Sequence, residues 1–122
     1  MGKKILVADD EVNIVAVVEA RLKANGYQVS TAENGEVAYR KIQQELPDLI
    51  ILDVMMPPPN GYQLCRMLKD DPQYKGIPVI LLTAKSTESD KFWGLESGAD
   101  AYVTKPYNSE ELLKKIAELL EK

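Results

Sequence analysis

Five polar side chains of complementary chemistry stand where four apolar segments of this 122-residue chain end. They are Asp9, Asp10, Asp53, Thr83 and Lys105. Carboxylates are hard oxygen ligands of the kind that Mg²⁺ prefers, usually together with phosphate oxygens and water. A phosphoryl group that moves onto a carboxylate spreads negative charge, which a metal ion and an ammonium can neutralise while a hydroxyl donates a hydrogen bond. The residue types therefore predict a Mg²⁺-dependent site of phosphoryl transfer.

The three acids differ in the role that their positions favour. Asp53 ends the most apolar segment, where partner groups can surround it, so it is the reasonable nucleophile. Asp9 and Asp10 begin a loop and suit metal binding. Each residue alone also has an ordinary explanation: Asp10 as the N-cap or first-turn acid of a helix, Thr83 as a strand former and Lys105 as a solvated strand end. Their convergence favours the site.

An alternation of strand and helix must position these residues. Short apolar or alternating runs predict strands at 5–8, 27–32, 48–53, 78–83 and 101–105. Helical spacing of apolar residues predicts helices at 11–25, between Gly35 and Pro47, at 62–71, at 86–97 and at 108–120. Five alternations with short connections predict a doubly wound α/β fold, a parallel sheet covered by helices on both faces. Groups that follow the carboxyl ends of such strands meet in one crevice.

Three local features are predicted in more detail. Leu46 continues the apolar line of the second helix, and Asn25-Gly26 ends the first helix. Asn108 and Glu111 suit a capping box at the start of the last helix. The prolines and glycine of residues 55–61 exclude regular structure after the third strand, with Pro57 and Gly61 as scaffold of that loop.

The composition predicts one soluble domain over residues 1–122. Apolar residues make up 45% and charged residues 28% of the chain, an ordinary globular balance. A net charge of -4 without a basic block argues against direct nucleic-acid binding. No apolar stretch approaches the roughly 20 residues that span a bilayer, so no membrane insertion is expected. Cys65 is the only cysteine and cannot form an internal disulfide, which favours the cytoplasm.

Four separated motifs carry a resemblance to a known family. They are ILVADDE, LIILDVMMPPPNGY, VILLTA and GADAYVTKPY. In this order and at this spacing, over essentially the full length, the chain resembles the response-regulator receiver domains of two-component signalling. The resemblance implies a flavodoxin-like five-stranded sheet in the order 2-1-3-4-5, as in a chemotaxis regulator of this family.

The resemblance also implies a role for each site residue. Asp53 would be the phosphoacceptor and Thr83 the switch hydroxyl. The resemblance further implies that Mg²⁺ is bound by Asp10, Asp53 and the Met55 backbone carbonyl, with Asp9 acting through water. It implies that Lys105 contacts the phosphoryl oxygens and that Lys105-Pro106 is a cis peptide. It also implies that Tyr102 is the switch aromatic. Tyr102 has an alternative role as a core aromatic on an edge strand.

The implied partners lie outside this chain. It contains no histidine, so a histidine kinase or phosphotransfer protein must supply the phosphoryl group. An output domain or protein would read the surface formed by the helix at 86–97, the strand at 101–105 and the last helix. A weak homodimer through that surface is a hypothesis, since Ala101 replaces an acid that is common there in dimerising relatives. The three prolines at 57–59 exceed the one that is usual in the family, and predict a stiff loop.

Two other classes of function compete with this one. A receiver-like module could bind a partner without being phosphorylated, although the intact set of site residues argues against it. An enzyme that turns over an external substrate is not expected. The loop ADDEVN after the first strand lacks the glycines of a dinucleotide site. Aspartyl phosphatases carry a second Asp two residues after the nucleophile, where this chain has Met55.

Overall fold

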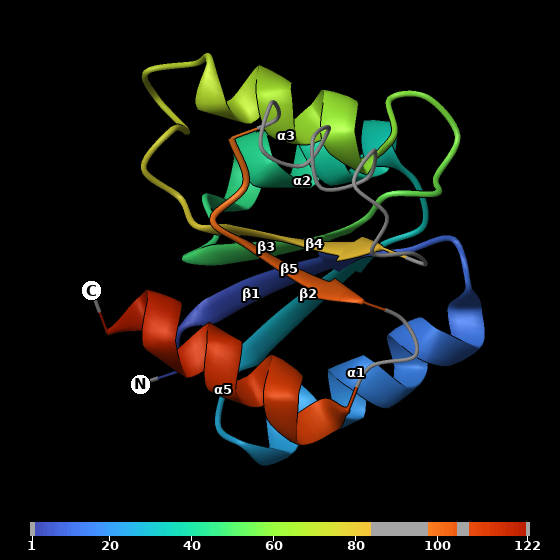
Figure 1. The fold of residues 1–122 in the computed structure, drawn as a ribbon, viewed down its shortest axis with the longest axis vertical. Coiled ribbons are helices and arrows are strands. Elements are labelled where there is room, and N and C mark those ends of the chain that lie inside the picture. The colour runs from blue at the N-terminus through green and yellow to red at the C-terminus, as the bar shows by residue number, and fades with distance from the viewer. Residues whose placement is uncertain (1, 84–97, 105–107, 122) are drawn as a thin grey trace.

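Five parallel strands form one sheet in the order β2-β1-β3-β4-β5, with helices packed on both faces (Figure 1). The computed structural model describes residues 2–83, 98–104 and 108–121. The strands are β1 (Lys4–Ala8), β2 (Gln28–Ala32), β3 (Leu49–Asp53), β4 (Val79–Thr83) and β5 (Ala101–Thr104). The helices are α1 (Val12–Ala24), α2 (Gly35–Glu45), α3 (Gly61–Lys69) and α5 (Ser109–Leu120). The predicted doubly wound α/β class and strand order are confirmed.

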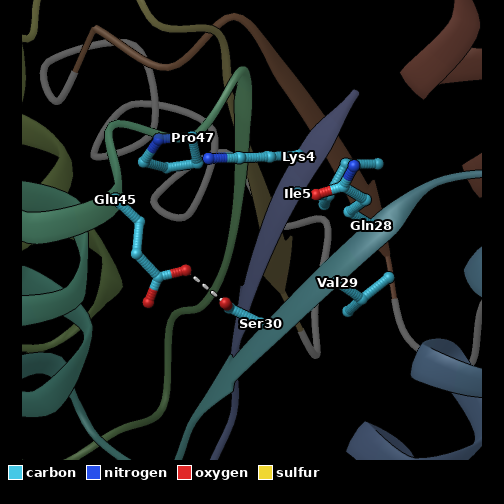
Figure 2. Close-up of a pocket in the computed structure, with 7 residues that line it drawn as sticks. All are labelled: Lys4, Ile5, Gln28, Val29, Ser30, Glu45 and Pro47. Carbon is cyan, nitrogen blue, oxygen red and sulfur yellow. Dashed lines mark hydrogen bonds between the residues drawn. The ribbon is translucent and has the colours of Figure 1, made fainter. Parts of the chain in front are cut away.

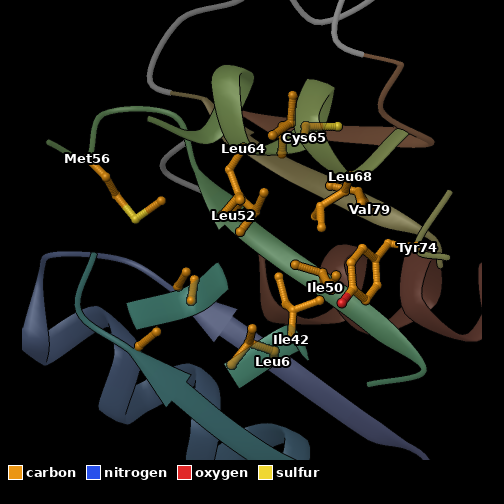
Figure 3. Close-up of a cluster of buried hydrophobic side chains, with 14 of the residues drawn as sticks. Leu6, Ile42, Ile50, Leu52, Met56, Leu64, Cys65, Leu68, Tyr74 and Val79 are labelled. Atoms are coloured by element: carbon orange, nitrogen blue, oxygen red, sulfur yellow. The ribbon is translucent and has the colours of Figure 1, made fainter. Parts of the chain in front are cut away.

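The strands are apolar on both faces because each face supports its own core. Alternation sends Ile50 and Leu52 of β3 toward α2 and α3, and Leu49 and Ile51 toward α1 and α5. Figure 1 shows α1 and α5 on one side of the sheet and α2 and α3 on the other. Figure 3 shows the core on the α2 and α3 side, where side chains from the strands meet Leu64, Cys65 and Leu68 of α3. The central strand β3 is thus held from both sides.

The ends of the first two helices follow their turn chemistry, with one exception. Gly26 has a φ of 88° after α1, which confirms the predicted stop. The Asn34 side chain caps α2 by accepting a hydrogen bond from Val37 N at 2.8 Å. Leu46 was expected inside the apolar line, but it caps α2 with a φ of 47° and is 51% exposed. The expectation was wrong because the chain leaves the helix after Glu45 to reach β3.

Caps of the later helices also correct the prediction. Asn108 does cap α5, but its side chain accepts from Glu110 N, so the expected box with Glu111 is not the observed cap. A reciprocal capping box forms instead at α3. There Asn60 accepts from Gln63 N, and the Gln63 side chain accepts from Asn60 N, both at 2.9 Å. This box fixes the point where the loop after β3 becomes a helix.

Some predicted features fall on other parts of the chain. The helix expected at 86–97 and the cis peptide expected at Lys105-Pro106 lie outside the described residues. Among the helices that the structure describes, none is both long enough and apolar enough to cross a membrane.

Lys69, the last residue of α3, contacts the segments that lead into β4 and β5. Lys69 Nζ donates to Asp100 Oδ2 at 2.8 Å and to the carbonyl oxygens of Ile77 and Lys75 at 2.9 and 3.1 Å. The same Asp100 oxygen accepts from Val79 N at 2.8 Å. The Lys69 side chain is only 15% exposed, so water cannot easily replace these acceptors. The contact holds the amino ends of β4 and β5 in place.

Replacing Lys69 with methionine is expected to lower the free energy of unfolding by about 2 kcal/mol, because three acceptors lose a charged donor. Urea denaturation of both proteins measures the difference. Lys23→Met is the matched control, since its pair with Glu19 joins residues one helical turn apart on the surface and should contribute less than about 0.5 kcal/mol. Equal losses in the two variants would show that Lys69 contributes only a surface charge.

Candidate functional site

The register of the sheet brings the predicted residues to one edge. Ala8 of β1 lies opposite Leu52 of β3. Asp9 and Asp53 are the next residues, so they lie side by side at the carboxyl ends of these neighbouring strands. Val54 N donates to Leu82 O at 3.0 Å, which carries the alignment on to the end of β4. The carboxyl ends of the three central strands therefore meet as the sequence predicts.

Three carboxylates gather at this edge. Asp9, Asp10 and Asp53 each offer an oxygen, and these oxygens lie within 4.8 Å of one another. Asp9 and Asp53 are both 1% exposed, whereas Asp10 is exposed to solvent. Like charges this close repel one another, and a divalent cation relieves the repulsion. The donor set consists of hard oxygens and includes a solvent-facing member, so it fits Mg²⁺.

Backbone hydrogen bonds orient the two buried acids. Asp9 Oδ1 accepts from Glu11 N at 2.9 Å, and Asp53 Oδ1 accepts from Met55 N at 3.2 Å. The N-cap position of α1 belongs to Glu11, which makes no side-chain cap. The alternative explanation of Asp10 as a helix N-cap is therefore wrong. The exposed carboxylate of Asp10 remains available to bind a metal together with Asp9 and Asp53.

Thr83 occupies the predicted place at the end of β4. It is 8% exposed and lies opposite Thr104 of β5 in the sheet register. Because β4 neighbours β3, the hydroxyl belongs to the same edge as Asp53. Lys105 follows directly after β5 in the sequence, but it lies outside the described residues.

The loop between β3 and α3 begins at the acidic cluster. Met55 is 70% exposed, whereas the next side chain, Met56, is buried in the core beside α2 and α3 (Figure 3). Gly61 closes the loop, and a Cβ there would lie 2.6 Å from the Asp53 carbonyl oxygen. The role of Gly61 as scaffold is therefore explained by close approach of two backbones.

Tyr102 of β5 points its ring into the core on the α3 side. Its hydroxyl is buried and makes no hydrogen bond to any described residue. Burial raises the pKa of Tyr102, and the nearby Cys65 thiol and Tyr62 hydroxyl raise that pKa further. Tyr102 therefore packs against the core on this face of the sheet.

Replacing Tyr102 with phenylalanine is expected to raise the free energy of unfolding by about 1 kcal/mol, since a buried hydroxyl without a partner is removed. Because the pKa of Tyr102 is higher in the folded chain, the unfolded chain ionises first as the pH rises. The free energy of unfolding of the wild type is therefore independent of this group below pH about 10, and falls as the pH rises from there through the folded pKa. Urea denaturation at neutral and alkaline pH measures both effects. A less stable variant at neutral pH would contradict the first.

A pocket lies near the start of β1, at the opposite end of this strand from Asp9 and Asp10. Its volume is about 270 Å³. Figure 2 shows Glu45 at the end of α2 reaching across to Ser30 of β2, whose hydroxyl donates to the Glu45 carboxylate. Its lining residues are Lys4, Ile5, Gln28, Val29, Ser30, Glu45 and Pro47. None of them is a predicted site residue.

Residues 5–117 match the sequence model of the response regulator receiver domain. The chain belongs to this family. Receiver domains are phosphorylation-controlled signalling domains of two-component systems, and they bind Mg²⁺ at an acidic pocket. They interact with histidine kinases and output domains.

Relatives of this receiver domain include regulators and solved structures. It is 46% identical over 120 residues to the alkaline phosphatase synthesis transcriptional regulatory protein PhoP of Bacillus subtilis, covering 98% of this chain and 49% of that protein. A crystal structure of a putative response regulator from Chloroflexus aurantiacus is 34% identical, with a TM-score of 0.95 and full coverage of both chains. The chain spans about half or less of the length of the curated relatives that it matches.

One structural neighbour carries a metal. The receiver domain of a sensor histidine kinase from Pseudomonas aeruginosa is 28% identical, with a TM-score of 0.92 and full coverage of both chains. That structure has a magnesium ion coordinated in its active site cleft.

The sequence and the structure agree on the acids and Thr83, and differ on what supports them. Asp9, Asp10, Asp53 and Thr83 do reach one edge of the sheet. Sequence reasoning missed the contact that Gly35 makes with the loop after β3, because the spacing of apolar residues uses Gly35 only as the boundary of the second helix. A glycine at the first position of a helix, where other residues cost less, was the available signal.

Proposed function

We propose that this receiver domain, over residues 1–122, is a phosphorylation-dependent switch whose phosphoacceptor is Asp53. The observation that carries the proposal is the gathering of three carboxylate oxygens within 4.8 Å, with Asp53 buried among them at the end of the central strand. Asp10, Asp53 and the Met55 carbonyl would hold Mg²⁺, with Asp9 acting through water. Bound Mg²⁺ would supply charge neutralisation at the transferring phosphoryl group.

The proposed transfer forms an acyl phosphate. An Asp53 carboxylate oxygen attacks the phosphorus of a phosphohistidine, the new O–P bond forms, and the N–P bond breaks with its electron pair returning to the imidazole. The donor histidine belongs to a kinase or phosphotransfer protein, because this chain has none. Lys105 would contact the phosphoryl oxygens. The hydrogen bond that Met55 N donates to Asp53 Oδ1 would hold the carboxylate so that its other oxygen can attack.

Phosphorylation would bias an equilibrium between two forms of the surface around β5 and α5. Thr83 would move toward the phosphoryl group, and Tyr102 would respond as the switch aromatic. Burial of the Tyr102 hydroxyl without a described partner supports this. The buried position of the hydroxyl costs free energy, so a small change at Thr83 can shift the equilibrium between the inward and outward positions of the ring. An output domain or protein would read the altered surface.

Incubation with a small phosphodonor and Mg²⁺ tests the proposal. The expected result is a mass increase of one phosphoryl group that is lost in acid or base and is absent when a chelator removes the metal. No increase, while an authentic receiver reacts in parallel, would favour the phosphorylation-independent interaction module. Light scattering of the phosphorylated form tests the weak homodimer, and a strict monomer would rule it out.

The cellular setting is part of the same proposal. A donor kinase that uses phosphohistidine and a single, buried free thiol at Cys65 both support action in the cytoplasm. The domain would act as a signalling component and not as an enzyme that turns over an external substrate. Its net charge of -4 supports a protein partner over direct contact with nucleic acid.

A further inference from the structure

The first residue of α2 lies directly against the loop that follows β3. Gly35 is buried, and a Cβ at this position would lie 2.0 Å from the Pro59 carbonyl oxygen and 3.0 Å from Pro59 Cγ. A real Cβ cannot approach a backbone atom so closely, so any side chain at Gly35 must displace the loop. Two segments that are more than 20 residues apart in the sequence are therefore in backbone contact.

The loop is fixed at its other points as well. Gly61 lies against the backbone of Asp53, and Met56 is buried in the core. Asn60 begins α3 with its capping box. Consecutive prolines restrict φ between these anchors, so a displacement at Pro59 cannot be absorbed locally. Figure 1 shows the loop leaving the end of β3 and passing alongside α2 and α3.

Met55 lies between Asp53 and these anchors. Its amide already donates to Asp53 Oδ1, and its carbonyl is the oxygen that the proposed function assigns to Mg²⁺. A shift of the stiff segment would move this carbonyl relative to the three carboxylates. Groups that orient a metal ligand without touching the metal commonly change metal affinity by about 10- to 100-fold when they are altered.

We propose that Gly35 is a positioning residue for the acidic site. By admitting the Pro59 carbonyl against the first turn of α2, it holds residues 54–60 where the Met55 carbonyl can join Asp10 and Asp53 around Mg²⁺. The inference rests on the proposed function and adds that Mg²⁺ affinity depends on a contact on a different element, the start of α2.

The test is Gly35→Ala, measured by calorimetric titration of the intact chain with Mg²⁺ at a temperature where circular dichroism shows it folded. The affinity for Mg²⁺ is expected to fall by about tenfold. The rate of phosphorylation by a small phosphodonor should recover toward the wild-type rate at saturating Mg²⁺, because Asp53 itself is unchanged. Gly76→Ala is the matched control, since a Cβ at Gly76 meets nothing within 4 Å.

A second variant loosens the loop without adding an atom at position 35, because it releases the φ angle of residue 59 and removes the Pro59 ring that faces Gly35. Pro59→Gly lets the loop leave α2 and should also weaken Mg²⁺ binding, and it decides the matter if Gly35→Ala does not fold. In the double variant the glycine at position 59 allows the carbonyl to turn away from the methyl group that Gly35→Ala introduces. Stability should then recover while Mg²⁺ affinity stays low, which a purely structural role for Gly35 would not produce.

The outcomes separate this inference from the proposed function. If the wild-type chain binds Mg²⁺ and folded Gly35→Ala or Pro59→Gly binds it equally well, Gly35 is not a positioning residue. If the wild-type chain neither binds Mg²⁺ nor gains a phosphoryl group, the proposed function itself fails. Amide chemical shifts of Met55 and Met56 in the metal-free variants give an independent measure, and unchanged shifts would also overturn the inference.

Discussion

Replacing Asp53 with asparagine is expected to abolish phosphoryl incorporation, a fall of at least about a hundredfold. An amide is a poor nucleophile and cannot form the acyl phosphate. The fold should survive, because asparagine has nearly the same shape and one of three clustered negative charges is removed. Mass spectrometry after incubation with a phosphodonor and Mg²⁺ measures labelling, and thermal denaturation measures stability.

The matched control is Asp70→Asn. Asp70 is an exposed acid whose side chain pairs with Arg66 on the surface of α3, so its replacement should leave labelling unchanged and stability within about 0.5 kcal/mol of the wild type. Undiminished labelling of the Asp53 variant would assign the phosphoacceptor elsewhere. Loss of labelling together with unfolding would show that Asp53 is needed for the structure, and Asp53→Glu, which keeps the charge, would then separate the two roles.

Replacing Asp10 with asparagine is expected to weaken Mg²⁺ binding by at least about tenfold. Asp10 is the solvent-facing member of the cluster and can exchange water for metal readily. Mg²⁺ at a hundred times its dissociation constant should stabilise the wild-type chain by about 2.7 kcal/mol, and at the same concentration a tenfold weaker variant gains about 1.4 kcal/mol. Thermal denaturation with and without Mg²⁺ measures both gains.

Without Mg²⁺ the Asp10 variant should be the more stable of the two proteins. Asp10→Asn then removes one of three like charges and is expected to be more stable than the wild type. Asp70→Asn again serves as control and should keep the full gain from Mg²⁺. An unchanged gain in the Asp10 variant would mean that the metal is held by other groups.

The match between sequence and structure is closest for the sheet. The runs that contain Ile5, Ile50 and Ile80 are apolar throughout because each strand is buried on both faces, and this local pattern is legible without any long-range information. Parallel order then sends every strand's carboxyl end to one edge. The place of Asp53 and Asp9 follows from that rule alone.

Details that depend on competing local choices were harder to predict. Leu46 has helical spacing, yet the path to β3 requires the chain to turn there and leaves it exposed. Asn108 has Glu111 three residues later, yet its side chain accepts from Glu110 N. In both cases several conformations satisfy the local pattern, and the surrounding structure selects one.

The sequence by itself determined the strands and helices that the structure describes, the doubly wound class and the four predicted residues that meet at one edge, because residue period and strand ends are local properties. Tertiary structure alone decided which contacts hold that edge. The approach of Gly35 to Pro59 and the bonds of Lys69 to Asp100 join segments more than 20 residues apart. Such contacts are set by the distance between packed backbones, which no pattern along the chain encodes.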